Sequence, residues 1–357
     1  MTPKERVWSA LRHEEPDRVP LAEFAIDYPV IEDVLGRETF CRAHFKEVQA
    51  YWDGRRDEVV ESYKRDTVEF ALKAGLDAVQ VGMVPPKGFQ PEVLEQIDEE
   101  TWRDWRGNTY RYSALTKDLM LMARQALPPT QEPKDPWEPP AEVDESELEL
   151  INHVVQELGD THFIFARMGR RLACGYPSAL GIVDQLMAIV DDPEGYAQRQ
   201  LRGAQGTDEH VGILHDLGVD TVCFGHDYGH NNGPFVSPEQ FRQIFFPAMR
   251  ARCEPVRRRG LPVMFHSCGD NRLILDQMIE AGMDCYQAIQ PEEDIAGLKR
   301  DWGDRLTLWG GVASHTLSMG SEDEVRQEVR HAVRSCAPGG GFIMGASHSV
   351  MVSAKPG

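Results

Sequence analysis

Two residues of metal-binding type stand two positions apart in the second half of the chain. His266 and Cys268 follow a short apolar run at residues 262–265. In an extended backbone, side chains two residues apart project to the same side, so the imidazole and the thiol converge at the end of this run. An imidazole nitrogen with a thiolate sulfur is a ligand pair well suited to zinc. A single pair of this kind is more often a buried cysteine beside a hydrogen-bonded histidine, so its meaning depends on which other groups reach the same place.

The residues after this pair are suited to a sharp change of direction. Gly269 permits a tight turn, and Asp270 or Asn271 can cap a helix that starts at the next residues. The pattern therefore predicts a strand, a turn that carries the two candidate ligands, and a helix.

The same strand-to-helix pattern recurs along the chain. Eight short apolar segments alternate with amphipathic stretches, and they are centred near Pro20, Val79, Ile164, Val222, Val263, Gln287, Thr307 and Ile343. Alternation of this kind predicts parallel pairing in an α/β protein, and eight units predict a TIM (β/α)8 barrel. The alternative is an open, doubly wound sheet, which lacks support because no G-x-G-x-x-G follows the first segment.

We expect residues 1–357 to form a single TIM-barrel domain. Residues 18–25 are predicted to be its first strand, and the aromatic-rich residues 91–113 to form strands of an excursion over the barrel mouth. A proline-rich, acidic stretch at about residues 126–144 is expected to be a solvated loop rather than a domain boundary. The sequence stops at Gly357, soon after the eighth predicted strand, so we expect the last helix to be very short or missing.

Polar groups and glycines gather at the predicted strand ends, where barrel active sites lie. They are Glu23 in the first segment, His226, Asp227, Tyr228 and His230 after the fourth, His266 and Cys268 after the fifth, Gln290 after the sixth, Gly310, Gly311 and His315 after the seventh, and His348 after the eighth. Each has an ordinary structural explanation by itself, as a cap, a surface residue or a turn. Their clustering at one end of the barrel favours a common site.

A catalytic zinc ion typically has three protein ligands and one open position. His266 and Cys268 supply two, and His348 is the preferred third, with Asp227, His226 and Glu23 as alternatives. A zinc ion of this kind can deprotonate a bound thiol, polarise a carbonyl group or activate water. The residues do not choose between these reactions.

The overall composition excludes several classes of function. The 357 residues carry a formal net charge of -20, which makes nucleic acid and membranes poor partners. No run approaches the length of a membrane span, and residues 1–17 are charged and helical, without the apolar core of a signal peptide. The seven cysteines are scattered and odd in number, so we expect no disulfide framework and a cytoplasmic location.

Several motifs together resemble the uroporphyrinogen decarboxylase superfamily over essentially the whole chain. They are Arg18-Val-Pro20, Gly75-Leu-Asp-Ala78, Asp227-Tyr-Gly229, Ser237-Pro-Glu-Gln-Phe-Arg242, His266-Ser-Cys-Gly269, Gly310-Gly311 and Gly339-Gly-Gly-Phe-Ile343. The resemblance implies a TIM barrel. It also implies one of two activities, because one branch decarboxylates uroporphyrinogen without a metal and the other contains zinc methyltransferases linked to corrinoids.

The residues at the site are closer to the methyltransferase branch. The decarboxylase branch has an arginine-rich motif where this chain reads Glu23-Phe-Ala-Ile-Asp-Tyr28, and an aspartate where it reads Gly82-Met83-Val84. The methyltransferase branch has His-x-Cys after the fifth strand, which His266 and Cys268 match. Where that branch has a cysteine after the eighth strand, this chain has Ser347-His348.

The resemblance implies a zinc-dependent methyltransferase of the methylcobalamin:coenzyme M type. A methyl group would pass between a corrinoid (methylcobalamin) on a partner protein and a thiol or a folate-like acceptor. The expected roles are metal binding by His266, Cys268 and His348, ligand orientation or proton transfer by Asp227, hydrogen bonding to substrate or corrinoid by Gln290, substrate or cofactor contacts by Glu23 and Tyr228, and close backbone approach at Gly310 and Gly311.

Two other functions remain open at the sequence level. One is a tetrapyrrole decarboxylase of the uroporphyrinogen decarboxylase type. The other is a non-catalytic accessory protein that binds a corrinoid or a metal at the same barrel mouth.

Overall fold

The computed structural model describes residues 1–123, 143–168, 182–290 and 293–354. Its helices are α1 (Pro3–Leu11), α2 (Tyr28–Leu35), α3 (Phe45–Trp52), α4 (Arg56–Ala74), a 3₁₀ turn (Glu145–Leu148), α5 (Glu149–Leu158), α6 (Ile182–Asp191), α7 (Pro193–Arg202), α8 (Thr207–Asp216), α9 (Pro238–Ile244), α10 (Phe246–Arg258), α11 (Leu275–Ala281), α12 (Ile295–Trp302), α13 (Ser314–Met319) and α14 (Glu322–Cys336). Its strands are β1 (Ala78–Val81), β2 (Glu95–Gln96), β3 (Thr101–Arg103), β4 (Thr109–Ser113), β5 (Asp118–Ala123), β6 (Phe163–Arg167), β7 (Thr221–Gly225), β8 (Gly229–His230), β9 (Gly233–Pro234), β10 (Val263–His266), β11 (Cys285–Ile289), β12 (Thr307–Val312) and β13 (Phe342–Ala346).

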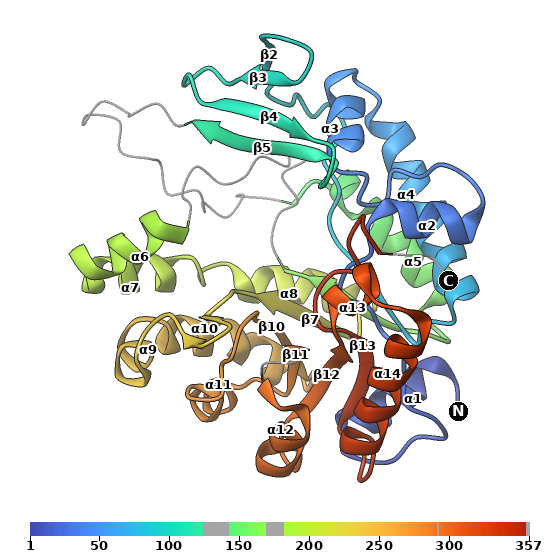
Figure 1. Ribbon diagram of the computed structural model, residues 1–357, viewed down its shortest axis with the longest axis vertical. Helices are drawn as coiled ribbons and strands as arrows, with labels where there is room; N and C mark the ends of the chain where they lie inside the picture. Colours follow the sequence, from blue (N-terminus) through green and yellow to red (C-terminus); the bar gives the residue numbers. More distant parts are fainter. Residues whose placement is uncertain (124–142, 169–181, 291–292, 355–357) are drawn as a thin grey trace.

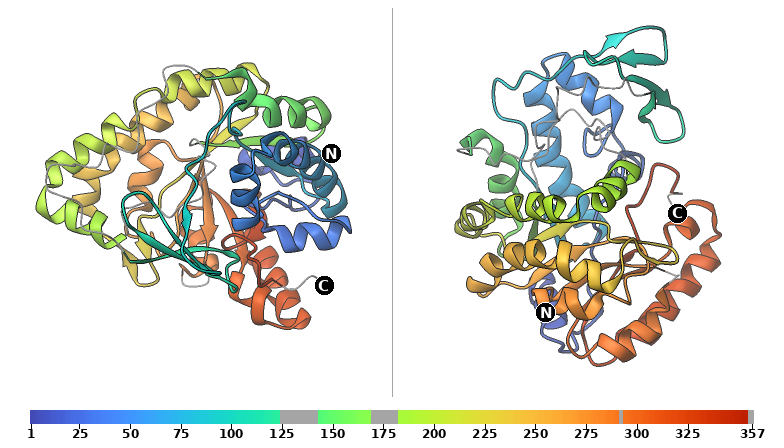
Figure 2. Two further views of the ribbon diagram at one scale, coloured as in Figure 1. Left: turned by 90° about the horizontal axis from the view of Figure 1, so that it is seen from above. Right: turned by 90° about the vertical axis from the view of Figure 1, so that its left-hand side faces the viewer.

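A curved sheet of seven parallel strands forms the centre of this α/β fold. Its order is β1-β6-β7-β10-β11-β12-β13, so strands that follow one another in the central sheet are also neighbours in space. Figures 1 and 2 show helices packed around the outside of the curve. The predicted alternation of parallel strands and helices is therefore confirmed.

The two faces of the central sheet carry two different parts of the core. Phe163 and Phe165 of β6 belong to an inner cluster with Trp309 of β12, whereas Ile164 and Ala166 belong to the outer core beneath the helices. Parallel strands covered on both faces show continuous apolar runs, as the sequence of β6 does. The last residue of a strand, by contrast, can reach the open end of the curve.

The predicted first strand, residues 18–25, is wrong as a continuous strand. The segment makes only isolated parallel bridges: Leu21 with Met344 of β13, Ala22 with Ala78 of β1, and Ile26 with Val350. It thus touches both edge strands of the central sheet.

Side chains interrupt the ladder between this segment and β13. The carbonyl oxygen of Ala22 accepts a hydrogen bond from Trp309 Nε1, at 2.9 Å. The N–H of Ala346 donates to the carboxylate of Glu23, at 3.0 and 3.1 Å. These are backbone groups that a continued parallel ladder would join, so side-chain partners replace strand pairing here.

A second sheet, of four antiparallel strands, follows β1. Its order is β2-β3-β4-β5, and it packs on α3 through a separate cluster that includes Phe45, Trp102 and Tyr110. In helix α1, the backbone N–H of Lys4 donates to the carbonyl oxygen of Thr161, just before β6, so α1 lies at the amino ends of the parallel strands. Figure 1 shows the antiparallel sheet on the opposite side. The prediction of strands in residues 91–113 is confirmed, and the sheet extends to Ala123.

Two long helical regions are each divided into a pair of helices. Residues 193–217 form α7 and α8, which separate at Gly203–Gly206, where Gly206 has a φ of 81°. Residues 237–259 form α9 and α10, because Pro247 has no N–H to continue the first helix and instead begins the second.

Three sequence-based expectations concern the remainder of the chain. The proline-rich loop lies mostly outside the described residues. All six cysteines that the structure describes are free thiols. Within the same ranges, no helix combines the length and apolar character needed to span a bilayer.

Candidate metal centre

The loop after β10 is shaped by close contact with the loop after β7. Gly269 has a φ of 86°, and a Cβ atom at this position would lie 2.3 Å from the backbone carbon of Gly229. A side chain is excluded here by both conformation and space. The predicted turn at Gly269 is confirmed, and it places Cys268 directly beside His266.

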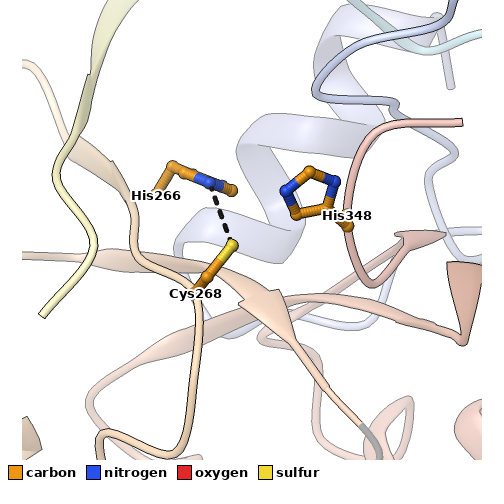
Figure 3. Close-up of side chains that lie close together, drawn as sticks. All are labelled: His266, Cys268 and His348. Carbon is orange, nitrogen blue, oxygen red and sulfur yellow. Dashed lines mark hydrogen bonds between the residues drawn. The ribbon is translucent and has the colours of Figure 1, made fainter. Parts of the chain in front are cut away.

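Three potential ligand side chains meet at this place (Figure 3). The ligand atoms of His266, Cys268 and His348 all lie within 4.8 Å of one another. The thiol Sγ of Cys268 is 3.5 Å from His266 Nε2, and the ring of His348 faces that of His266 edge-on, with 5.9 Å between ring centroids. The carboxyl ends of β10 and β13 therefore bring one candidate ligand set together, although β11 and β12 lie between these two strands in the sheet.

The ring of His266 is fixed on two sides. Its Nδ1 is hydrogen-bonded to Oε1 of Gln287, which is wholly buried on the neighbouring strand β11. Phe24 stacks on its face at 4.2 Å, with the planes 3° apart. Because Nδ1–H donates to Gln287, the proton-free Nε2 points toward Cys268, as a metal-ligating histidine requires.

The sequence-based search missed both Gln287 and Phe24. Gln287 sits opposite His266 in the register of β10 and β11, and this register is the signal that could have identified it. Phe24 stands beside Glu23, which was selected, but an apolar ring gives no sign in the sequence that it will contact a histidine.

Burial keeps both histidines neutral. It lowers the pKa of His266 and that of His348, because a charged imidazolium is poorly solvated there. Burial, followed by the charge of Asp227, raises the pKa of the Cys268 thiol to about 12. Neutral imidazole is the ligating form of histidine, whereas a cysteine in this setting needs a nearby cation to become a thiolate.

Asp227 lies at the solvent side of the three candidate ligands. Its Oδ1 accepts the backbone N–H of Cys268 at 2.9 Å and is 3.6 Å from His266 Nε2. The side chain is 53% exposed, so the carboxylate can be reached by a ligand that enters from solvent.

A buried hydrogen-bond network holds the loop after β10 in place. The side-chain amide of Asn271 donates to the carbonyl oxygens of Cys268 and Gly269, at 3.1 and 3.0 Å, and to the hydroxyl of Tyr286. The Tyr286 hydroxyl in turn donates to Glu293, at 2.8 Å. Burial raises the pKa of Glu293 to about 8. Asn271 was expected only as a helix cap, and it instead holds the backbone that carries Cys268.

Gln290 and Tyr228 each make contacts that stabilise the loops around the site. Gln290 Oε1 accepts the N–H of Gly269 at 2.7 Å, so this side chain ties the loops after β10 and β11 together. Tyr228 is 3% exposed and packs among Phe241, Phe245 and Phe265. Its placement in the core gives no support to the predicted contact with a substrate.

The paired glycines allow close packing within the protein. A Cβ on Gly310 would lie 3.0 Å from Ile289 of β11, and one on Gly311 would lie 2.8 Å from Ala332 of α14. The predicted close backbone approach thus occurs here between elements of the fold.

The two remaining alternative ligands, His226 and Glu23, are not part of the group of three whose ligand atoms lie within 4.8 Å of one another. His226 packs against Tyr228 and Phe245, and burial lowers its pKa to about 4. Glu23 accepts the Ala346 N–H and lines a cavity, and burial raises its pKa to about 8.

The donor set fits zinc. One sulfur and two imidazole nitrogens are ligands that zinc accepts in tetrahedral catalytic sites, and a fourth position remains for another ligand. The bond from Gln287 to His266 is the outer contact that usually accompanies such a ligand.

The chain matches a known family over its C-terminal half. Residues 181–357 fit the family model described as uroporphyrinogen decarboxylase (URO-D). The resemblance to the uroporphyrinogen decarboxylase superfamily is confirmed. The matched residues contain all three candidate ligands. No curated protein matches the chain.

Solved structures are similar to the chain at low sequence identity. A methyltransferase from Methanosarcina mazei is 17% identical, with 100% of this chain and 95% of that chain covered and a TM-score of 0.65. A putative vitamin-B12 independent methionine synthase from Listeria monocytogenes is 10% identical, with 94% and 93% covered and a TM-score of 0.45. At such identities the first similarity establishes the fold alone.

Proposed function

We propose that this protein is a zinc-dependent methyltransferase that moves a methyl group between a corrinoid on a partner protein and a small molecule. The observation that carries the proposal is the convergence of His266, Cys268 and His348 within 4.8 Å. The family match and the fold shared with a methyltransferase support it. We further propose that residues 20–26 complete a closed TIM barrel and that the protein acts in the cytoplasm.

The three ligands would hold the metal at the carboxyl ends of the parallel strands. When bound, zinc supplies the positive charge that keeps a coordinated thiol deprotonated at neutral pH and therefore nucleophilic. Gln287 keeps Nε2 of His266 free to ligate, and the loop network of Asn271 fixes the position of Cys268. These hydrogen bonds hold the candidate ligands in position in the absence of a metal.

Asp227 is the residue best placed to handle a proton. Its exposed carboxylate lies beside both His266 and Cys268, where an incoming thiol would lose its proton. We propose that Asp227 accepts this proton or orients the substrate. Gly82 and Met83, which follow β1, offer no carboxylate, and this argues against the decarboxylase alternative.

Methyl transfer from methylcobalamin tests the proposal. The zinc-loaded protein, mixed with methylcobalamin and 2-mercaptoethanol under anaerobic conditions, should convert the methylcobalamin spectrum to that of the demethylated corrinoid. Cys268→Ala and His348→Ala should abolish this conversion, because each removes a metal ligand. His215→Ala, a change at an exposed histidine on α8, should leave it intact.

Two results would contradict the proposal. If the purified protein binds no zinc and leaves methylcobalamin unchanged, the methyltransferase is excluded as drawn. If zinc and cobalamin bind tightly but no thiol or folate acceptor supports transfer, a non-catalytic accessory protein is the better account.

A further inference from the structure

A cavity of about 580 Å³ opens beside the proposed metal centre. It lies where the segment after Ala22 parts from β1, and helices α2 and α4 close its other side. Its volume is in the range of small-molecule sites in proteins. Residues 18–25 pair with β1 through a single bridge, between Ala22 and Ala78, and the cavity lies beyond that bridge.

The cavity and the proposed metal centre share one wall. Phe24 lines the cavity and stacks on the ring of His266, at 4.2 Å between centroids. Arg167, at the end of β6, also lines it, with its guanidinium 5.3 Å from the centre of the Phe24 ring. A molecule in the cavity would thus lie next to the side chain that positions a candidate ligand.

Most of the lining is apolar. Its larger apolar members include Ile31, Phe70, Leu76, Val79, Met83 and Leu150. At the α4 end, polar groups have partners within the protein: Arg42 binds Asp27 at 3.0 Å, and Asp66 accepts hydrogen bonds from Arg37, Thr39 and Ser62. At that end, a bound ligand would therefore need few polar groups of its own.

Gln80 differs from these polar groups. Its side-chain Nε2 is buried and has no hydrogen-bond partner. Gln80 is paired with Phe165 in the register of β1 and β6, and Phe165 belongs to the inner core cluster. The amide is thus on the inner side of the sheet, and a buried donor without an acceptor destabilises the folded protein unless a ligand supplies one.

Glu23 presents a second donor at the same cavity. Its carboxyl group accepts the Ala346 N–H, and burial raises its pKa to about 8. At neutral pH the group is mostly protonated, so its O–H can donate to a ligand. These two uncharged donors, with the Arg167 guanidinium also in the lining, match an acceptor and disfavour a cation.

We propose that this cavity binds a small, largely apolar molecule that presents an uncharged oxygen acceptor to the side-chain amide of Gln80. As a deepening of the proposed function, and resting on it, we assign this molecule as the small-molecule partner in methyl exchange. The binding itself requires neither zinc nor a corrinoid.

Two probes of matched skeleton test the chemistry. Acetophenone carries a carbonyl oxygen that only accepts hydrogen bonds, and 1-phenylethylamine carries an ammonium group that only donates. Their dissociation constants for the full-length protein are measured by ligand-observed NMR titration. Acetophenone should bind more tightly than the amine.

The variant Gln80→Leu separates a ligand contact from a structural role. It should weaken acetophenone binding about three- to tenfold, which is the value of one hydrogen bond, and leave amine binding unchanged. It should also raise the melting temperature, because an unpaired buried donor is removed. The control Gln327→Leu, beside a separate cavity between α12 and α14, should leave both dissociation constants unchanged.

Three outcomes would overturn the assignment: no acetophenone binding up to its solubility limit, tighter binding of the amine, or equal acetophenone affinity in Gln80→Leu. These results are distinct from a failure of the proposed function. Lost methyl transfer with intact acetophenone binding would reject the zinc chemistry, whereas zinc-dependent transfer without acetophenone binding would reject only the cavity.

Discussion

The imidazole of His266 is oriented by Gln287 and Phe24 before any ligand arrives. Gln287 Oε1 accepts a hydrogen bond from Nδ1–H, and Phe24 fixes the plane of the ring. Such preorganisation strengthens metal binding, because the ring does not lose rotational freedom when it ligates.

Replacing Gln287 with leucine tests this orientation. Gln287→Leu removes the acceptor for Nδ1–H and frees the ring to rotate or change tautomer. The affinity for Zn²⁺ should fall about 10- to 100-fold. Competition with a chromogenic chelator measures the change, and Gln277→Leu, whose amide donates to Pro238 on the surface, is the matched control. Unchanged affinity in Gln287→Leu would show that Gln287 does not orient a ligand.

For single residues, the sequence identified the candidate metal ligands but not the side chains that hold these ligands in place. His266, Cys268 and His348 were selected because ligand-type side chains follow predicted strands, and the structure brings their ligand atoms together. Gln287, Asn271 and Glu293 were not selected for the site. Their roles depend on strand register and on loop backbone geometry, which one sequence does not reveal.

At the scale of elements, two glycines lock the loops after β7 and β10 together. Gly269 must adopt a positive φ while its backbone touches that of Gly229.

A pair of alanine substitutions separates the cost of a positive φ from the cost of a steric clash at Cβ. Gly269 and Gly88 have φ values of 86° and 79°, but only Gly269 has backbone atoms where a Cβ would lie. Gly88→Ala should cost about 1–2 kcal/mol of unfolding free energy from its backbone conformation. Gly269→Ala should cost about 3 kcal/mol or more, because the two loops must also separate.

Urea unfolding followed by circular dichroism measures both values. Zinc affinity should fall in Gly269→Ala and stay unchanged in Gly88→Ala. Equal losses of stability in the two variants would mean that the close approach of the two loops has no energetic role.

The elements themselves were largely predictable. Seven of the predicted strand centres, from Val79 to Ile343, fall in the described parallel strands, because buried parallel strands leave unbroken apolar runs in a sequence. The segment at Pro20 differs because Trp309 and Glu23 take backbone groups that a strand would have paired. Such long-range competition leaves no local pattern.

At the scale of the whole molecule, His44 links three distant parts of the chain. Its Nε2 lies 3.1 Å from Asp27 and its Nδ1 lies 3.5 Å from Asp118 at the start of β5. Asp27 also accepts the backbone N–H of Val352, close to the C-terminal end of the described chain. The antiparallel sheet, the α2 region and the chain end therefore meet at one histidine.

This link predicts a loss of stability in mildly basic solution. Burial disfavours the charged ring of His44, but the bonds to Asp118 and Asp27 outweigh it and raise the pKa to about 9. The folded state therefore holds the proton more tightly than the unfolded state, whose pKa is near 6.5. The contribution is complete below about pH 6.5 and is lost as the pH rises through about 9.

Unfolding free energies measured at pH 6 and pH 9.5 test whether stability falls as the pH rises. The protein should be less stable at pH 9.5, and His44→Gln should reduce the difference, because it removes the titrating group. Glu23 and Glu293, whose pKa values are also raised, add to the loss at high pH in both proteins and so do not mask the comparison. An identical pH dependence in His44→Gln would remove His44 from this role.

X-ray absorption at the zinc edge of the purified protein shows whether His266, Cys268 and His348 hold one zinc ion. We expect about one zinc per chain, with one sulfur neighbour near 2.3 Å and nitrogen neighbours near 2.0–2.1 Å, and loss of the sulfur neighbour in Cys268→Ala. A protein that holds no zinc after loading, or whose zinc has no sulfur neighbour, would not have this metal centre.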